Sequence, residues 1–166
     1  KDIIEQLFEI LSCFAKNNCS IYQLDSFPVK VCHNIRIQRA NILKGKEFRG
    51  YNSSKKEYFY GFKVQVITSD SGYIIEFNFC PGSYHDMSAF DILDFNLPEN
   101  SELLTDKAYN DYNLEEILLE HHKIRLLPIR KKNSKKEDNN ICANYYRQTK
   151  RHIIENIFSL TDRLLP

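Results

Sequence analysis

Three acidic side chains stand at positions from which they could together bind divalent cations. Asp25 follows the apolar run 21–24, and Asp106 follows the similar run 103–105. Glu155 lies on the polar side of a late segment with helical periodicity. Carboxylate oxygens are the ligands that Mg²⁺ prefers, and two such ions can stabilise both the attacking and the leaving oxygen of a phosphoryl displacement. The pattern predicts metal-dependent phosphoryl transfer if the fold brings the three side chains together.

Each of these acids also has an ordinary structural explanation. Asp25 could begin a turn, because Asp is common in turns. Asp106 could end a strand and pair with its neighbour Lys107. Glu155 could pair with Arg151 one helical turn earlier, an interaction that contributes only about a few tenths of a kcal/mol. Pattern alone does not choose between these explanations and a metal site.

The elements that would position these residues are predicted by hydrophobic periodicity. We expect helices over residues 2–15, 83–93, 114–121 and 144–164, strands over residues 21–24, 58–68, 73–79, 102–105 and 124–129, and loops over residues 27–57 and 130–140. The turn-forming residues 69–72 separate two alternating strands, which predicts a β-hairpin. Asn113 is the expected cap of the third helix. This order predicts an α/β fold with a mixed sheet flanked by helices.

The final helix has a polar stripe that contains both Arg151 and Glu155 at about 100° per residue. The opposite side carries apolar residues: Ile153, Ile154, Ile157, Leu160, Leu164 and Leu165. Glu155 is therefore expected to point away from the core, toward either a cleft or open water.

The composition is that of a globular domain without a strong overall charge. The chain has 166 residues, ten Tyr, eleven Phe and a formal net charge of +1, so any affinity for DNA must come from local patches. The five cysteines include no Cys-x-x-Cys pair, and reduced thiols are expected. No apolar run is long enough for a membrane span. We expect residues 1–18 to end an N-terminal helical region and residues 19–166 to form one domain.

Several ordered segments of the sequence resemble a group of bacterial transposases. They are Asp25-Ser26-Phe27-Pro28-Val29, Arg49-Gly50-Tyr51-Asn52, Tyr58-Phe59-Tyr60-Gly61, Pro81-Gly82-Ser83, Asp106-Lys107-Ala108-Tyr109-Asn110-Asp111-Tyr112, Leu127-Pro128-Ile129-Arg130-Lys131-Lys132-Asn133-Ser134 and Arg163-Leu164-Leu165-Pro166. Over about residues 20–166 the chain is similar to DDE-type transposases of the insertion-sequence family numbered 982. The resemblance implies an RNase H-like, retroviral-integrase-like domain that cuts and rejoins DNA at the ends of a mobile element.

The resemblance also implies roles for individual residues. Asp25, Asp106 and Glu155 match the acidic triad of the family, which would hold two Mg²⁺ or Mn²⁺ ions for endonuclease cleavage and strand transfer. His85 and Asp86 are second choices for residues near the metals. Predicted DNA contacts are Arg49, Lys55, Lys56, Lys107, Arg130, Lys131, Lys132 and Arg151. Related transposases carry Tyr and Lys where this chain has Gln148 and Asp162, so two of their phosphate contacts have no counterpart here.

Partners and setting follow from the same resemblance. We expect transposon ends and target DNA as partners, no membrane association, homo-oligomers of the full-length protein, and a bacterial cytoplasmic, nucleoid-associated location. Because the chain begins at Lys1 without Met and stops at Pro166, we expect a catalytic-domain fragment that is truncated at its C-terminus. Two alternatives are a metal-dependent nuclease on the same fold and an inactive transposase remnant that binds DNA without cutting it.

Overall fold

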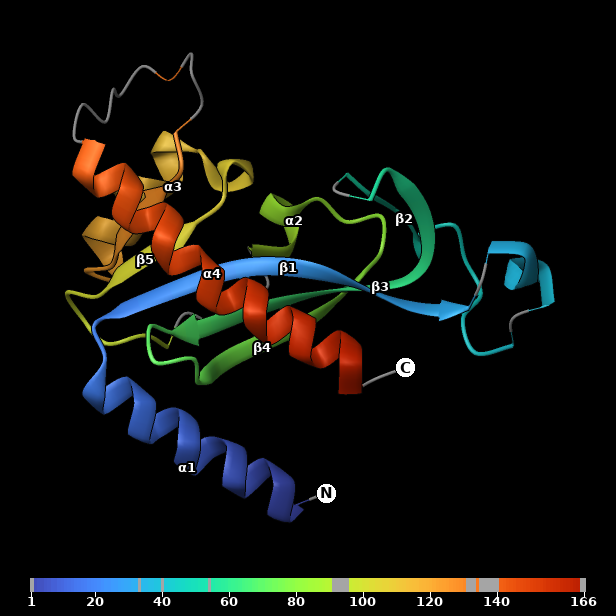
Figure 1. Cartoon of the computed structure of the whole chain (residues 1–166), viewed down its shortest axis with the longest axis horizontal. Coiled ribbons are helices and arrows are strands. Elements are labelled where there is room, and N and C mark those ends of the chain that lie inside the picture. The colour runs from blue at the N-terminus through green and yellow to red at the C-terminus, as the bar shows by residue number, and fades with distance from the viewer. Residues whose placement is uncertain are drawn as a thin grey trace. The chain divides into compact units, whose positions relative to one another are not determined.

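The computed structural model describes residues 2–32, 34–39, 41–53, 55–90, 96–130, 134 and 141–164 (Figure 1). The chain divides into two compact units. The first unit contains residues 1–25, 66–76 and 94–166, and the second unit contains residues 26–65 and 77–93. Each unit is described by itself below.

The strands of the described residues form one mixed sheet. They are β1 (Ile21–Cys32), β2 (Arg49–Asn52), β3 (Glu57–Ser69), β4 (Ile74–Pro81), β5 (Glu102–Thr105) and β6 (Arg125–Pro128). Their order is β2-β3-β1-β5-β6, with β4 beside β3. β5 runs parallel to both β1 and β6, and β2 is antiparallel to β3. The predicted α/β class with a mixed sheet and helices is confirmed.

Three helices belong to the first unit: α1 (Asp2–Asn18), α3 (Tyr112–His121) and α4 (Ile141–Leu164). The short 3₁₀ turn η2 (Lys107–Tyr109) follows β5. The carboxylate of Asp111 caps α3 by accepting hydrogen bonds from the backbone N–H groups of residues 113 and 114. α4 passes over β5 and the first residues of β1 (Figure 1), where the buried Ile154 lines the same recess as Leu104.

The core of the first unit is formed by side chains from both faces of its strands. Its fully buried members include Tyr22, Leu24, Ile67, Ile75, Leu103, Ile124 and Ile154. α1 adds little to this core, because Ser12 and Ala15 are its only buried residues among those described. Six of its apolar side chains are exposed: Ile3, Ile4, Leu7, Ile10, Leu11 and Phe14. None of the helices that the structure describes combines the length and apolar character needed to cross a membrane.

The second unit contains β2, residues 26–32 of β1, residues 57–65 of β3 and residues 77–81 of β4. It also contains the 3₁₀ helix η1 (Asn34–Arg39) and the short helix α2 (Asp86–Phe90). Phe62 packs edge-on against both Phe48 and Phe79. Gly61 has a φ of +157°, and a Cβ atom there would lie 2.0 Å from the carbonyl oxygen of Val29. Only glycine permits this close approach of two strands.

Several boundaries differ from those predicted. The strand predicted at 21–24 continues through Asp25 to Cys32, and parts of the predicted loop 27–57 lie in η1 and β2. Pro28 lacks an N–H donor and argues locally against a strand, but the β-branched residues Val29 and Val31 follow it in β1. Asp111, not Asn113, caps α3.

Other predicted elements are confirmed with small shifts. The hairpin consists of β3 and β4, and β5 has the predicted bounds. The final helix starts at Ile141, three residues before the predicted position. Its predicted apolar side is only partly buried, since Leu160 is exposed. Residues 91–95, 131–133 and 135–140 lie outside the described residues, and with them most of the predicted 130–140 loop.

Candidate active site

Two of the three acids are brought together by the parallel pairing of β1 and β5. Leu24 lies opposite Thr105 in this register, and each of these residues is followed by an aspartate, Asp25 in β1 and Asp106 after β5. Because successive side chains alternate between the faces of a sheet, Asp25 and Asp106 project from the same face. β1 and β5 are adjacent strands, so the two aspartates lie at neighbouring positions. Asp106 follows the carboxyl end of β5, the edge at which ligands bind in parallel sheets.

Arg151 of α4 connects the acids to one another. Its Nη1 lies 2.9 Å from Asp106 Oδ1 and donates a hydrogen bond to it. Its Nη2 lies 3.5 Å from Asp25 Oδ2, and its Nε lies 3.1 Å from Glu155 Oε1. All three carboxylates of the acidic triad (Asp25, Asp106 and Glu155) therefore meet at one guanidinium group.

The charge at this point is unbalanced. Three carboxylates and one guanidinium leave a formal charge of −2. Burial alone would lower the pKa of Arg151, but the three carboxylates together raise it above its ordinary value. His152 Nδ1 also lies 3.3 Å from Glu155 Oε2.

A recess that is open to solvent lies beside the triad. It is lined by Asp25, Asp106 and Arg151 above an apolar base that includes Leu104 and Ile154. Gln23 also lines it, on the same strand face as Asp25 and two residues before it. Its side chain is only 2% exposed, and neither its amide nitrogen nor its amide oxygen has a hydrogen-bond partner among the described residues. A buried amide without a partner is costly, so this recess suits a polar, hydrated ligand.

The chemistry of these residues fits a divalent cation, although their present spacing does not. Carboxylate oxygens are the ligands preferred by Mg²⁺, which also retains several waters. The unpaired amide of Gln23 could hydrogen-bond such a water. Among the described residues, however, no three acidic, Cys or His side chains are close enough to one another to hold a metal ion. The triad carboxylates are spaced around the guanidinium of Arg151, which stands where a shared cation would stand.

Two other predicted DNA contacts, Lys107 and Arg130, follow the ends of β5 and β6. Lys107 is exposed, and its backbone N–H donates a 2.6 Å hydrogen bond to Asp106 Oδ1. Arg130 is instead held inside the first unit by Glu115, with two contacts between the guanidinium and the carboxylate. It also donates to Asn110 Oδ1 at 3.0 Å and lies over the ring of Tyr112. These contacts favour a structural role for Arg130, and its predicted contact with DNA stays a prediction.

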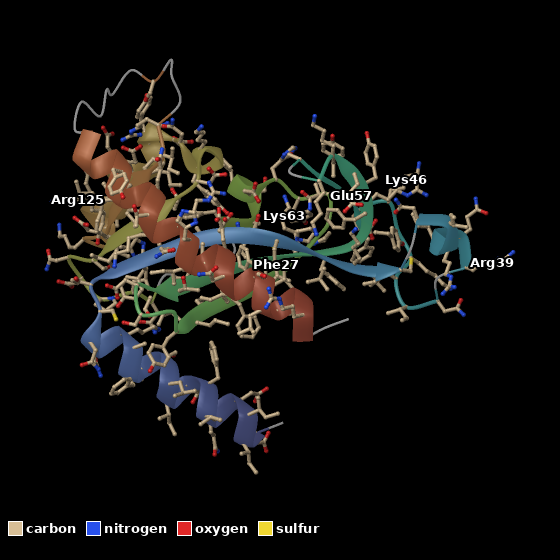
Figure 2. The ribbon with its side chains drawn as sticks, in the orientation of Figure 1. Phe27, Arg39, Lys46, Glu57, Lys63 and Arg125 are labelled. Atoms are coloured by element: carbon tan, nitrogen blue, oxygen red, sulfur yellow. The ribbon has the colours of Figure 1, made fainter. Side chains whose placement is uncertain are left out.

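The remaining predicted residues lie in the second unit or outside the described residues. Arg49, Lys55, Lys56 and His85 are exposed in the second unit, and Lys131 and Lys132 lie outside the described residues. Asp86 accepts a 2.7 Å hydrogen bond from Ser26 and lies 3.2 Å from Lys63 Nζ. Figure 2 labels Lys63 within this second unit. The role of His85 and Asp86 near metal ions stays a prediction.

Gln23, Ser26 and Lys63 were not among the residues that the sequence predicted for the site. A signal for Gln23 was present, because it is a polar residue in an apolar strand and shares the face of Asp25. No local signal could have identified the contact of Ser26 with Asp86, since sixty residues separate them.

Comparison with protein families shows to which family this chain belongs. It matches the family model described as the transposase DDE domain over residues 15–164, a range that contains the whole triad. The chain therefore belongs to the transposase DDE domain family, whose members transfer phosphoryl groups of DNA and generally use divalent metal ions. Comparisons with curated proteins and with solved structures found no match. The narrower assignment to the insertion-sequence family numbered 982 stays a prediction.

Proposed function

We propose that this chain is the catalytic part of a transposase that cleaves DNA at the ends of an insertion sequence and joins the freed 3′ ends to a target. The observation that carries this proposal is the convergence of Asp25, Asp106 and Glu155, from three separate elements, on one cationic group. Family membership supports the general class of reaction, and the RNase H-like fold that the family implies suits the parallel arrangement of β1, β5 and β6.

The triad would hold the metal ions, either Mg²⁺ or Mn²⁺. When bound, two such ions activate the attacking oxygen and stabilise the leaving 3′ oxygen. The protein's own contribution is to keep Asp25 and Asp106 on rigid strands and Glu155 on α4. Gln23 would orient a water at the base of the recess. No Ser or Tyr nucleophile is needed, because water and then a 3′-hydroxyl attack the phosphorus directly.

Basic side chains would position the DNA backbone around this recess. Lys107 is exposed directly beside Asp106 and could contact a phosphate near the reacting one. With a net charge of only +1, such local contacts must supply the salt-dependent part of the affinity. The predicted basic residues of the second unit (Arg49, Lys55 and Lys56) would extend the contact with DNA. Assembly into oligomers and a nucleoid-associated location remain predictions for the full-length protein.

The proposal is tested by changing one triad carboxylate and one control carboxylate from the same strand. Asp106→Asn keeps the shape of the side chain but removes the charge that would bind the metal. Even partners outside the metal's first shell cost about 10- to 100-fold when they are lost, so Mn²⁺-dependent cleavage of DNA carrying an element end should fall at least about 100-fold. Glu102→Gln is the control.

Glu102 begins β5 and pairs at 3.2 Å with Arg125, whose side chain is mostly exposed (Figure 2). Exposed pairs contribute at most about 1 kcal/mol to stability, so Glu102→Gln should cleave like the unmodified protein. Cleavage by Asp106→Asn at a similar rate would contradict the proposal. Products joined to target DNA distinguish a transposase from the nuclease alternative, which would only cut.

A further inference from the structure

We propose that Arg151 is a displaceable counter-ion, which holds the acidic triad together without metal and leaves its centre when a divalent cation binds. This inference rests on the proposed function, since it concerns the same site. Under this proposal, Arg151 positions the three carboxylates before metal and DNA bind. It also accounts for a triad that is gathered at one point but is not yet arranged to hold a metal ion.

The first support is the number of elements that the guanidinium connects. A simple pair one helical turn apart would involve only Glu155. Arg151 also contacts Asp25 in β1 and Asp106 after β5, which are 126 and 45 positions away in the chain. The guanidinium is thus a partner that the three carboxylates share, and it offsets their mutual repulsion across the recess.

The second support is that none of these contacts is complete. Strong guanidinium–carboxylate pairs form two parallel hydrogen bonds. Arg151 instead approaches each acid with a different nitrogen, at 2.9 Å for Asp106, 3.1 Å for Glu155 and 3.5 Å for Asp25. Its Nε is buried and lies 3.1 Å from a Glu155 oxygen, yet it has no hydrogen-bond partner among the described residues. Each contact is therefore weaker than a bidentate pair would be.

The third support is the charge and the space at the site. With one guanidinium the site keeps a formal charge of −2, so a divalent cation at the same position would balance it better. The guanidinium does not lose its proton in proteins, so it must move rather than become neutral. The Arg151 side chain is 35% exposed and borders the open recess, so it has room to move without breaking the core.

Mn²⁺ binding without DNA tests this inference by a readout other than activity. Titration calorimetry would compare the unmodified protein with Arg151→Gln and with the control Lys150→Gln. Lys150 is the adjacent cation on α4, but its partner is Asp70 at 3.6 Å, outside the triad. We expect Arg151→Gln to bind Mn²⁺ about tenfold more tightly, because no cation then competes for the carboxylates. The control should change the affinity less than about twofold.

An unchanged or weakened affinity in Arg151→Gln would overturn the inference. Asp106→Asn separates this result from a failure of the proposed function. If Asp106→Asn binds Mn²⁺ as well as the unmodified protein, the triad is not the metal site. If it loses binding while Arg151→Gln gains none, the metal site stands and only the displacement is wrong.

A second measurement is made on the unmodified protein, with a conservative variant used only to assign the signal. In protein with ¹⁵N-labelled arginine, the side-chain signal of Arg151 should shift on saturation with Mg²⁺, and Arg151→Lys would identify it by its absence. The guanidinium of Arg130 is paired with Glu115, so the signal of Arg130 should stay unchanged and serve as the internal control. An Arg151 signal that does not respond to Mg²⁺ would also overturn the inference.

Discussion

Arg130 and Arg151 are two arginines of the first unit with opposite surroundings, although both were predicted to contact DNA. Arg130 shares two contacts with a single acid, Glu115, and both side chains are nearly buried at 15% and 10% exposure. Arg151 divides its contacts among three acids beside an open recess. The charge of Arg130 is balanced by one carboxylate, whereas Arg151 faces three carboxylates and thus an excess of negative charge.

This difference separates an arginine that maintains the fold from one that belongs to a site. The Arg130 pair joins the end of β6 to α3, and the ring of Tyr112 and the amide of Asn110 complete its surroundings. Breaking such a buried pair leaves an uncompensated charge. The contacts of Arg151 are partly exposed and unbalanced, so another cation can replace them.

The largest effect that would test this comparison is on stability. Arg130→Met should lower the free energy of unfolding by about 3 kcal/mol, because Glu115 would remain buried without its partner. Arg151→Gln should lower it by about 1 kcal/mol or less, since its contacts are partly exposed. Urea unfolding with and without Mg²⁺ measures both.

Because Arg130→Met keeps the triad, Mg²⁺ should stabilise it only as much as the unmodified protein, whereas Mg²⁺ should stabilise Arg151→Gln by a larger amount. A second change, Glu115→Leu in the Arg130→Met background, should recover part of the loss by removing the buried charge. The comparison fails if Arg130→Met is as stable as the unmodified protein, or if Mg²⁺ stabilises Arg151→Gln no more than it stabilises Arg130→Met.

A smaller effect is expected in the salt dependence of DNA binding. Each phosphate contact contributes about −0.9 to the slope of log affinity against log salt. Changing Lys131 and Lys132 together to Ala should flatten the slope by up to about 1.8, and weaken binding to all sequences alike. Arg130→Gln should change the slope little, because its guanidinium is occupied by Glu115.

Arg125→Ala is the matched control for this binding measurement. Arg125 is exposed and lies at the opposite end of β6 from Arg130. A slope that flattens equally for Arg125→Ala would show a general charge effect. An unchanged slope for the Lys131 and Lys132 variant would remove this segment from the DNA-binding surface.

The smallest expected effect on stability concerns Tyr22, whose hydroxyl forms a hydrogen bond without an ion pair. Its side chain lies on the face of β1 opposite Asp25. The hydroxyl of Tyr22 donates to the carbonyl oxygen of Cys19 at 2.8 Å, so Tyr22→Phe should cost about 1 kcal/mol at pH 8. Burial, with smaller contributions from Cys19 and Asp70, raises the pKa of Tyr22 to about 12. An unfolded tyrosine has a pKa of about 10.

The folded state therefore holds this proton over a range where the unfolded state has lost it. The contribution of the Tyr22 hydroxyl is complete below about pH 10 and declines as the pH rises toward 12. The stability difference between the unmodified protein and Tyr22→Phe should shrink over that range in denaturant unfolding. A constant difference would mean that the hydroxyl ionises equally in both states.

Local patterns in the sequence determined much of the fold. The alternation of residues 58–68 and 73–79 around a turn is a short-range property, and it predicted the β3–β4 hairpin. The apolar run before Asp106 likewise predicted β5, and the resemblance to transposases singled out the three acids. Such features depend on neighbours in the chain, so periodicity and turn chemistry are sufficient to predict them.

Tertiary structure alone decided how the charged groups are paired. From the sequence, Arg151 had an evident partner only in Glu155, four residues away, and Arg130 was predicted to contact DNA. The folded chain places Asp106 within hydrogen-bond distance of Arg151, and Glu115 within that of Arg130. Helical spacing predicts only the nearest ion pairs. Which distant carboxylate a guanidinium meets depends on where strands and helices pack together, and that packing separated the structural arginine from the arginine at the site.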